Sequence, residues 1–324
     1  MKLLVIADPL ASFKTYKDST FAMMREAARR GHELHAMEAR ELILRGGRVL
    51  GRTARVLLKA PGADPHDWFE AATPAFAPLP TFDIVLMRKD PPFDNEYLYA
   101  THLLELAARQ GARVVNDPRT IRDFNEKLAV ARFPQFAPPT LVTSLDEVLR
   151  EFLAEHGDVI FKPLDGMGGS GVFRVRTDDP NIGVIIETIT DHGRRTIMAQ
   201  RYLPEIRDGD KRVLLIDGVP APYALARIPR AGETRGNLAA GGTGVARPLT
   251  DRDREIGETV GPVLRDLGLT LVGLDVIGTH LTEINVTSPT GMQEIAAQTP
   301  CDPAALMIDA LERLAARPAR GADR

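Results

Sequence analysis

The sequence contains a single cysteine, Cys301, among its 324 residues. One cysteine cannot form an intrachain disulfide, which is typical of a protein kept in a reducing compartment. The seven histidines are scattered and show no zinc-ligand spacing. No run of about 18 apolar residues occurs, so no segment is expected to span a membrane. Asp8 interrupts the short apolar run at the N-terminus, which argues against a signal peptide. We therefore expect a cytoplasmic protein.

A large excess of charge of either sign is also missing. The formal net charge is −3, so the chain as a whole has no electrostatic attraction to nucleic acid or to an anionic membrane. Hydrophobic residues make up 44% of the sequence, which is enough to fill a core and excludes a disordered chain. The length suggests roughly two domains. Any phosphate-binding site must be built from local basic residues.

The first part of the chain alternates strand and helix patterns. Four apolar runs predict buried strands, at residues 3–7, 33–37, 82–87 and 113–115. Helical spacing predicts helices at 20–30, where Asp18 or Ser19 can act as the N-cap, and at 97–109. This alternation is typical of a parallel α/β layer, in which ligands bind where the strands end. Asp8 and Arg88 lie at such ends.

The pattern changes after about Pro118. A helix is predicted over residues 121–133, and Ser144 begins a capping box for a second helix that ends at His156. Short strands then follow in hairpins, at residues 159–162, 172–176, 196–200, 213–216, 221–228, 271–277 and 281–286, with a helix at 251–267. This α+β pattern places a domain boundary near residue 120. We expect domains at 1–120 and 121–315, followed by a disordered tail at 316–324.

A glycine-rich hairpin follows Lys162. Residues 166–171 match G-x-G-x-x-G, and Glu187 lies about 20 residues further on, as in a dinucleotide-binding fingerprint. That fingerprint must open a helix, whereas residues 172–176 alternate like a strand. No Gly-Lys-Ser/Thr follows, which excludes a Walker loop. The remaining hypothesis is a loop whose backbone N–H groups, with the Lys162 ammonium, hold phosphates. A plain surface turn with a solvated lysine is the alternative.

Asp275, Glu283 and Asn285 form a possible metal site. Glu283 and Asn285 are two residues apart on a predicted strand, so their side chains point to one face. Asp275 lies on the partner strand of the same hairpin and can face them. Two carboxylates and an amide oxygen are ligands that Mg²⁺ takes when it also binds nucleotide phosphates. A polar solvent-facing hairpin is the alternative, although residues 271–277 are otherwise too apolar for an exposed edge.

Two further segments carry arginines. Residues 227–244 are rich in glycine and arginine, which is typical of a mobile lid over a reacting centre and equally of a disordered surface loop. The turn at 208–212 leads into a strand and brings in Arg212, whose guanidinium could bind a carboxylate or phosphate with two hydrogen bonds. An ordinary charged turn is the alternative there.

In their order along the chain, these motifs resemble the ATP-grasp superfamily and, within it, the bacterial glutathione synthetases. The matching segments extend over about residues 1–296, at 17–23, 86–94, 125–128, 162–169, 198–204, 208–212, 235–242 and 281–291. The segments MRKDPP at 87–92 and NVTSPT at 285–290 are specific to this family. Residues 40–80 match weakly. Gln293 stands where the family pattern has an arginine, and Thr243 where the lid often has one.

The resemblance implies a parallel α/β N-terminal domain, then an ATP-grasp fold with antiparallel sheets and a lid at 228–244. It implies that the nucleotide is bound by Lys127, Lys162, Gly166, Gly168, Gly169, Gln200, Tyr202, Leu203 and Asp210. Arg212, Arg227 and Arg235 would be catalytic. Substrate would contact Arg88, Arg212, Arg227, Ser288 and Thr290. Asp275, Glu283 and Asn285 would bind Mg²⁺, with Mn²⁺ as a possible substitute.

The activity implied by the resemblance is ATP-dependent joining of γ-glutamylcysteine to glycine through an acyl phosphate. Such phosphoryl transfer needs charge neutralisation and alignment, which lysines, arginines and Mg²⁺ supply. The family also suggests a homo-oligomer, a dimer or a tetramer, with no nucleic-acid or membrane partner. Three alternatives remain: an ATP-grasp ligase for another acid and amine, a nucleotide-binding module without catalysis, and a nicotinamide-dependent oxidoreductase that rests on the G-x-G-x-x-G match alone.

Overall fold

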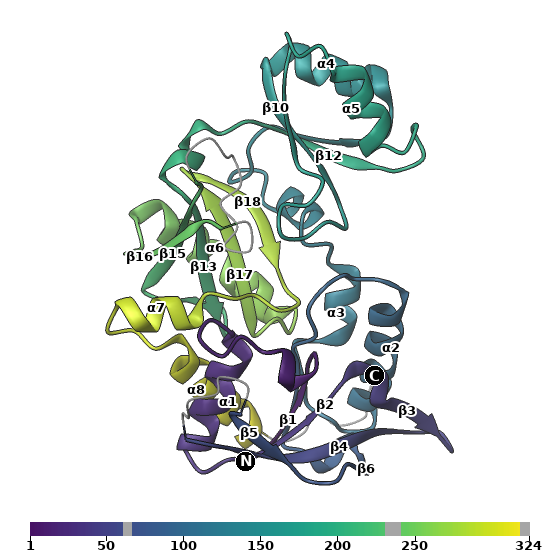
Figure 1. The fold of residues 1–324 in the computed structure, drawn as a ribbon, viewed down its shortest axis with the longest axis vertical. Helices are drawn as coiled ribbons and strands as arrows, with labels where there is room; N and C mark the ends of the chain where they lie inside the picture. Colours follow the sequence, from purple (N-terminus) through teal and green to yellow (C-terminus); the bar gives the residue numbers. More distant parts are fainter. Residues whose placement is uncertain (61–66, 231–240, 318–324) are drawn as a thin grey trace.

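The structure, a computed structural model, describes residues 1–60, 67–230 and 241–317. Three sheets follow one another along the long axis of the molecule (Figure 1). The N-terminal sheet has eight strands, the next in sequence has four, and the last has six. Arg235, most of the predicted lid and residues 318–324 lie outside the described residues. Among the described helices, none is long and apolar enough to cross a membrane.

Four parallel strands form the centre of the N-terminal sheet, in the order β2 (Glu33–Met37), β1 (Lys2–Ile6), β7 (Ile84–Met87) and β8 (Val114–Val115). Helices α1 (Ser19–Arg29) and α2 (Asn95–Arg109) pack with them. The Asp18 side chain accepts a hydrogen bond from Phe21 N and caps α1, as expected. The predicted parallel α/β layer is confirmed by these four strands.

An antiparallel extension of this sheet was not expected from the sequence. Strand β4 (Arg48–Leu58) pairs antiparallel with β2 and carries β3 (Leu42–Arg45), β5 (Phe69–Ala71) and β6 (Ala75–Pro78). Burial alternates along β4, but arginines occupy several outward positions and glycine one of the inward ones. The apolar alternation that identifies a strand is therefore weak there.

The helix predicted over residues 121–133 is wrong. The structure has α3 (Pro118–Asp123) and then a separate 3-10 turn, η4 (Leu128–Arg132). Between them, Asn125 Oδ1 accepts hydrogen bonds from Lys127 N at 3.1 Å and Leu128 N at 3.0 Å. An asparagine side chain that takes up nearby backbone donors competes with the helix. The break lays Glu126 and Lys127 against strand β18 (His280–Asn285).

The four-stranded sheet is antiparallel, in the order β11 (Phe173–Arg176), β10 (Asp158–Pro163), β12 (Ile197–Arg201) and β9 (Thr140–Thr143). Helices α4 (Asp146–His156) and α5 (Ile182–Ile189) cover one face (Figure 1). The predicted capping box at Ser144 is wrong, because Leu145 is the N-cap and makes no side-chain bond. Thr143 Oγ1 instead accepts from Leu145 N at 3.1 Å and forms the turn before the helix.

The six-stranded sheet has the order β16 (Thr243–Pro248), β15 (Tyr223–Ile228), β13 (Asp210–Ile216), β17 (Leu271–Ile277) and β18, with β14 (Val219–Pro220) paired to β13. Helices α6 (Asp251–Asp266), α7 (Met292–Gln298) and α8 (Pro303–Ala316) complete this part. The chain returns to its beginning, because α8 packs on α1 (Figure 1), where Arg30 pairs with Asp309 at 2.6 Å and Glu312 at 3.0 Å. Short 3-10 turns occur at η1 (Leu10–Ser12), η2 (Ala39–Glu41), η3 (Leu79–Thr81) and η5 (Pro204–Asp208).

Gly261 in α6 lies directly against Gly218 in the turn after β13. A Cβ added at Gly261 would lie 2.0 Å from Gly218 O, and a backbone atom cannot move aside cheaply. We expect Gly261→Ala to lower the free energy of unfolding by about 1–3 kcal/mol, measured by urea denaturation. The matched control is Gly183→Ala in α5, where the nearest atom is Arg150 Nη2 at 3.6 Å. The control should keep or raise stability, and equal midpoints for the two variants would contradict the packing.

Candidate active site

A cavity of about 580 Å³ opens between the four-stranded and the six-stranded sheets. Its wall combines β10 and β12 of the four-stranded sheet with the ends of β13, β15, β17 and β18 of the six-stranded sheet, and residues 12–18 close one end. Most of the predicted site residues line it: Lys127, Lys162, Gly166, Gly168, Gly169, Gln200, Tyr202, Leu203, Asp210, Arg212, Arg227, Asp275, Glu283, Asn285, Ser288 and Thr290. The topology thus gathers into one cavity residues that are up to 163 positions apart, since 290 − 127 = 163.

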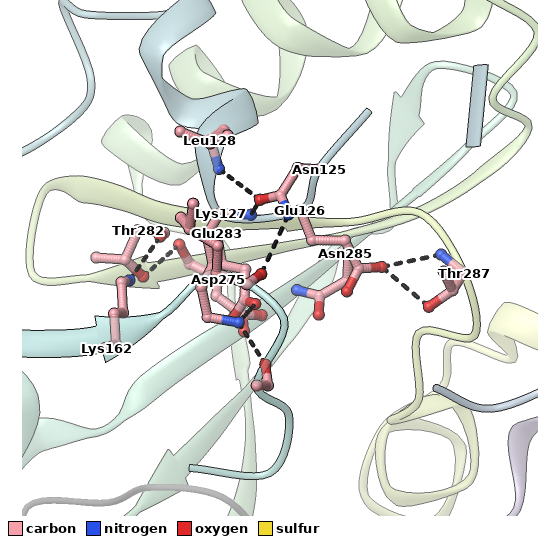
Figure 2. Close-up of polar contacts among 12 residues, drawn as sticks. Asn125, Glu126, Lys127, Leu128, Lys162, Asp275, Thr282, Glu283, Asn285 and Thr287 are labelled. Atoms are coloured by element: carbon pink, nitrogen blue, oxygen red, sulfur yellow. Dashed lines mark hydrogen bonds and ion pairs between the residues drawn. The ribbon is translucent and has the colours of Figure 1, made fainter. Parts of the chain in front are cut away.

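Two lysines from different elements bond to neighbouring residues of β18, Lys127 to the Glu283 carboxylate and Lys162 to the Thr282 backbone oxygen (Figure 2). Lys127 Nζ lies 3.0 Å from Glu283 Oε1 and also donates to Gly166 O. Lys162 on β10 is buried, and its Nζ donates to Thr282 O at 3.3 Å. Burial lowers the pKa of Lys162 to about 8, although the charge of Glu283 opposes this shift. A bound polyanion would satisfy both ammonium groups.

The glycine loop joins β10 to β11 as an antiparallel hairpin, with Phe161 paired to Phe173. The strand after the loop excludes the dinucleotide fingerprint, which requires a helix there. Gly168 and Gly169 have φ of 63° and 80°, a backbone region that favours glycine. A Cβ at Gly166 would meet Pro163 Cγ at 2.6 Å. The loop therefore depends on its glycines to lie over the cavity with backbone groups accessible.

Charged side chains cross the six-stranded sheet as a row. The strand registers pair Asp210 with Arg227, Arg212 with Asp275, and Asp275 with Glu283. Arg212 holds Asp275 through two hydrogen bonds, Nε to Oδ1 at 2.6 Å and Nη2 to Oδ2 at 3.2 Å. Arg227 Nη2 pairs with Asp210 and also lies 2.9 Å from Asp275 Oδ2. We call these five residues the charge row.

The two aspartates of the charge row are in different electrostatic situations. Burial opposes ionisation of Asp275, but the guanidiniums of Arg212 and Arg227 outweigh it and hold the pKa of Asp275 below its usual range. Burial raises the pKa of Asp210 to about 6 in spite of the Arg227 charge, with the charge of Asp275 adding to the increase. Asp210 Oδ1 is buried without a hydrogen-bond partner among the described residues. At this end of the charge row, the described residues therefore do not supply all the hydrogen bonds that the Asp210 carboxylate can accept.

The oxygen ligands expected for a metal lie together. Asp275 and Glu283 are opposite each other on β17 and β18, and Asn285 lies two residues further on the same face (Figure 2). Asn285 Nδ2 donates to Gly273 O at 3.2 Å, so its amide oxygen is the atom available to a cation. Within residues 1–60, 67–230 and 241–317, no three His, Cys, Asp or Glu side chains form a metal-binding group. Two carboxylates and one amide fit Mg²⁺ that completes its shell with phosphate oxygens and water.

The other end of the cavity is built from the end of β12 and the residues that follow it. Gln200 donates from Nε2 to Thr140 Oγ1 at 3.0 Å, and Tyr202 N donates to Asp158 O at 3.0 Å. The Arg174 guanidinium lies 3.5 Å from the centre of the Tyr202 ring, and Asp158 holds that guanidinium with two bonds at 2.9 and 2.6 Å. A cation stacked on an aromatic face restrains the ring. This restraint was missed from the sequence, because Arg174 has the pattern of an ordinary exposed strand position.

Arg88 is not among the described residues that line the cavity. It is buried, and it donates from Nη2 to Pro289 O at 2.9 Å and from Nε to Thr20 Oγ1 at 3.1 Å. Burial lowers the pKa of Arg88, although the charge of Asp18 opposes this, and its Nη1 has no partner among the described residues. In this conformation Arg88 supports the loop that carries Ser288 and Thr290 from behind.

Comparison with known proteins identifies the family. The model for the N-terminal domain of prokaryotic glutathione synthetase matches residues 1–122, and the model for its ATP-grasp domain matches residues 126–300. The chain belongs to the prokaryotic glutathione synthetase family. The glutathione synthetase of Nitrosomonas europaea is 63% identical over 98% of this chain and 99% of that protein. That of Ralstonia nicotianae is 58% identical over 100% and 99%.

Solved structures agree with this glutathione synthetase family fold. A D-cycloserine synthetase superposes with a TM-score of 0.66 at 15% identity, covering 96% of this chain and 99% of that one. An ATP-grasp ligase complexed with a precursor peptide and AMPPNP gives 0.63 at 18% identity, covering 98% and 99%. The expected ATP-grasp fold is confirmed, and the chain is an ATP-dependent ligase. The oxidoreductase alternative and the non-catalytic alternative are thereby set aside.

Lys162 gives a direct test of the cavity as a nucleotide site. We expect Lys162→Met to weaken ATP binding by about ten- to a hundredfold, because one charge-assisted contact with phosphate is lost. In the unmodified protein the ammonium begins to deprotonate near its pKa of about 8. The Kd for ATP should therefore rise by up to about tenfold per pH unit above pH 8, and this dependence should be absent in the variant.

The matched control is Lys211→Met, since Lys211 is also largely buried but bonds Asp253 and does not line the cavity. Titration calorimetry with ATP between pH 7 and 9 is the measurement. An ATP affinity of Lys162→Met equal to that of the unmodified protein would contradict the assignment.

Proposed function

We propose that this ligase joins the cysteinyl carboxylate of γ-glutamylcysteine to the amine of glycine, with ATP converted to ADP and phosphate. The observation that supports this best is the charge row, which concentrates two guanidiniums beside two ammonium groups in one cavity. Polyphosphate and a carboxylate are both anions, and bringing them together requires such a concentration of positive charge. The relatives of 58–63% identity that are named glutathione synthetases support the choice of substrates.

The first step that we propose is attack of a carboxylate oxygen on the γ-phosphorus. The bond to the β–γ bridging oxygen breaks, ADP leaves, and an acyl phosphate forms. Lys127 and Lys162 bind the phosphates, and Arg212 and Arg227 hold the acid and the transferring phosphoryl group. When bound by Asp275, Glu283 and Asn285, Mg²⁺ supplies additional positive charge to the phosphate oxygens.

In the second step the glycine amine attacks the acyl carbon. The carbon–oxygen bond to phosphate breaks, phosphate leaves with the electron pair, and the nitrogen loses a proton. Arg212 retains the departing phosphate through its guanidinium, while its bond to Asp275 keeps the group aligned. The adenine lies in the pocket formed by Gln200 at the end of β12 and by Tyr202 and Leu203 directly after it.

Further features of the proposal rest on the family resemblance and the sequence. We propose a domain division near residue 120, a dimer or tetramer as the working assembly, and a cytoplasmic location in keeping with the single Cys301. We propose a lid at 228–244, with Arg235 in a catalytic role. Mn²⁺ is proposed as a substitute for Mg²⁺.

The substrates are tested by identifying the product. The protein is incubated with ATP, Mg²⁺, glycine and γ-glutamylcysteine, and the mixture is separated and analysed by mass spectrometry. We expect glutathione in a one-to-one ratio with ADP. ADP formation only with a different acid or amine, in the same assay, would replace the proposed substrates and leave the ligase chemistry intact.

The metal ligands are tested through the dependence on Mg²⁺. Glu283→Gln removes one charged ligand, and we expect the Mg²⁺ concentration for half-maximal activity to rise by about 10- to 100-fold. Glu258→Gln on the exposed face of α6 is the control and should not change it. An unchanged Mg²⁺ requirement in Glu283→Gln would refute the assignment of Glu283 as a metal ligand.

A further inference from the structure

Glu126 lies in the break between α3 and η4 and has no role in the proposal above. Its Oε1 accepts three hydrogen bonds, from Val286 N at 2.8 Å, Thr287 N at 3.0 Å and Thr287 Oγ1 at 2.9 Å. Figure 2 shows the side chain reaching past Asn285 to Thr287. The backbone oxygen of Glu126 also accepts from Ile284 N at 2.9 Å. One residue therefore holds the end of β18 and the first residues after it.

The segment held by Glu126 continues into the loop 288–290. Ser288 Oγ donates to Asp90 Oδ1 at 2.5 Å, Pro289 O accepts from Arg88, and Thr290 O accepts from Arg212 Nη1 at 3.4 Å. These contacts come from Arg88 and Asp90 of the N-terminal part and from Arg212 of the charge row. Glu126 holds the residues directly before this loop, and it is the chain neighbour of Lys127.

Lys127, the residue after Glu126, contacts the same strand. Lys127 binds Glu283 at 3.0 Å, three residues before the segment that Glu126 holds. These two consecutive residues thus contact the chain on either side of Asn285. Lys127 contacts Glu283 before it, and Glu126 contacts residues 286 and 287 after it. A shift of the loop relative to Lys127 is resisted directly by this pair of contacts.

We propose that Glu126 is a positioning residue that holds the loop 286–290 in register with the phosphate-binding Lys127. Through the loop it sets where the acid substrate meets the γ-phosphate. This inference rests on the proposed function, because it assigns the loop to the acid substrate and Lys127 to ATP. The hydrogen-bond acceptor, and not the charge, is what the role requires, since all three bonds fall on one oxygen.

The test compares Glu126→Ala with Glu126→Gln. Alanine leaves the donors at 286 and 287 without their acceptor, so the loop loosens. We expect the KM for the acid substrate to rise by about tenfold or more and kcat to fall, while the KM for ATP changes less than about threefold. Glutamine retains an oxygen at the same distance, so both constants should return to within about threefold of the unmodified protein. Both variants are assayed as purified full-length protein.

A matched control separates positioning from loss of stability. Glu26 is a buried carboxylate that accepts bonds from Arg29 and Arg30 at 2.6–2.7 Å, and unlike Glu126 it does not line the cavity. Glu26→Ala should lower the melting temperature and leave every KM unchanged. If Glu126→Ala does not fold, Glu126→Asp, which withdraws the acceptor by one methylene, is measured in its place and should show the same split between the two KM values.

Three results would overturn the proposal. The first is that Glu126→Ala, or Glu126→Asp in its place, changes only the amount of active protein. The second is an equal effect on the KM for ATP and the KM for the acid. The third is that Glu126→Gln is as impaired as Glu126→Ala, which would assign the role to charge. Turnover of γ-glutamylcysteine by the unmodified protein is measured first, so failure of the proposed function is seen independently, and the variants are then compared with whichever acid supports ADP release.

Discussion

The site depends on burying opposite charges side by side on one face of the six-stranded sheet. A lone charge taken out of water is strongly unfavourable, and a pair is tolerated only when its geometry and hydrogen bonds are good. The registers of β15, β13 and β17 meet this condition, because ordinary strand pairing sets Asp210 opposite Arg227 and Asp275 opposite Arg212. Fully buried apolar residues such as Val213, Leu274 and Val276 hold these strands in place. The sheet core therefore fixes the direction of Arg212 and Arg227 before any ligand arrives.

The charge row and the nearby Lys162 include groups that are incompletely satisfied, and these face the cavity. Lys162 has one long hydrogen bond and a pKa lowered to about 8, and Asp210 Oδ1 has no partner among the described residues. Groups that a protein buries without full partners are typical of functional sites, since a ligand completes them. The nucleotide phosphates and their cation have the charges required. These incompletely satisfied groups lower the stability of the empty protein. ATP binding is strengthened because the ligand provides their missing partners.

Individual strands and helices could be predicted from the sequence where a single hydrophobic periodicity dominates. Strand β17 is buried along most of its length, and its predicted limits at 271–277 agree with the structure. The position of Asp275 opposite Glu283 could also be predicted, because side chains alternate between the two faces of a strand and both residues lie on one hairpin. The link at 124–127 could not be predicted, because Asn125 overrides helical spacing through side-chain bonds to two backbone N–H groups. The contacts of Glu126 were missed for the same reason, since a helix over 121–133 would have pointed it elsewhere. Helix α8 packs on α1 through buried apolar residues such as Met307 and Leu311, and Arg30 pairs with Asp309 beside them. No local pattern reveals a contact between residues about 280 positions apart.

Lys162 should be incompletely protonated in the empty cavity and should gain its full positive charge when ATP binds. Titration calorimetry of MgATP binding at pH 8, repeated in buffers of different ionisation enthalpy, counts the protons exchanged. With the pKa of Lys162 near 8 in the empty protein, binding should take up about half a proton per site. The uptake should become smaller as the pH is lowered from 8 to 7, where more of the ammonium is already charged. Binding with no proton uptake at pH 8 would contradict the account.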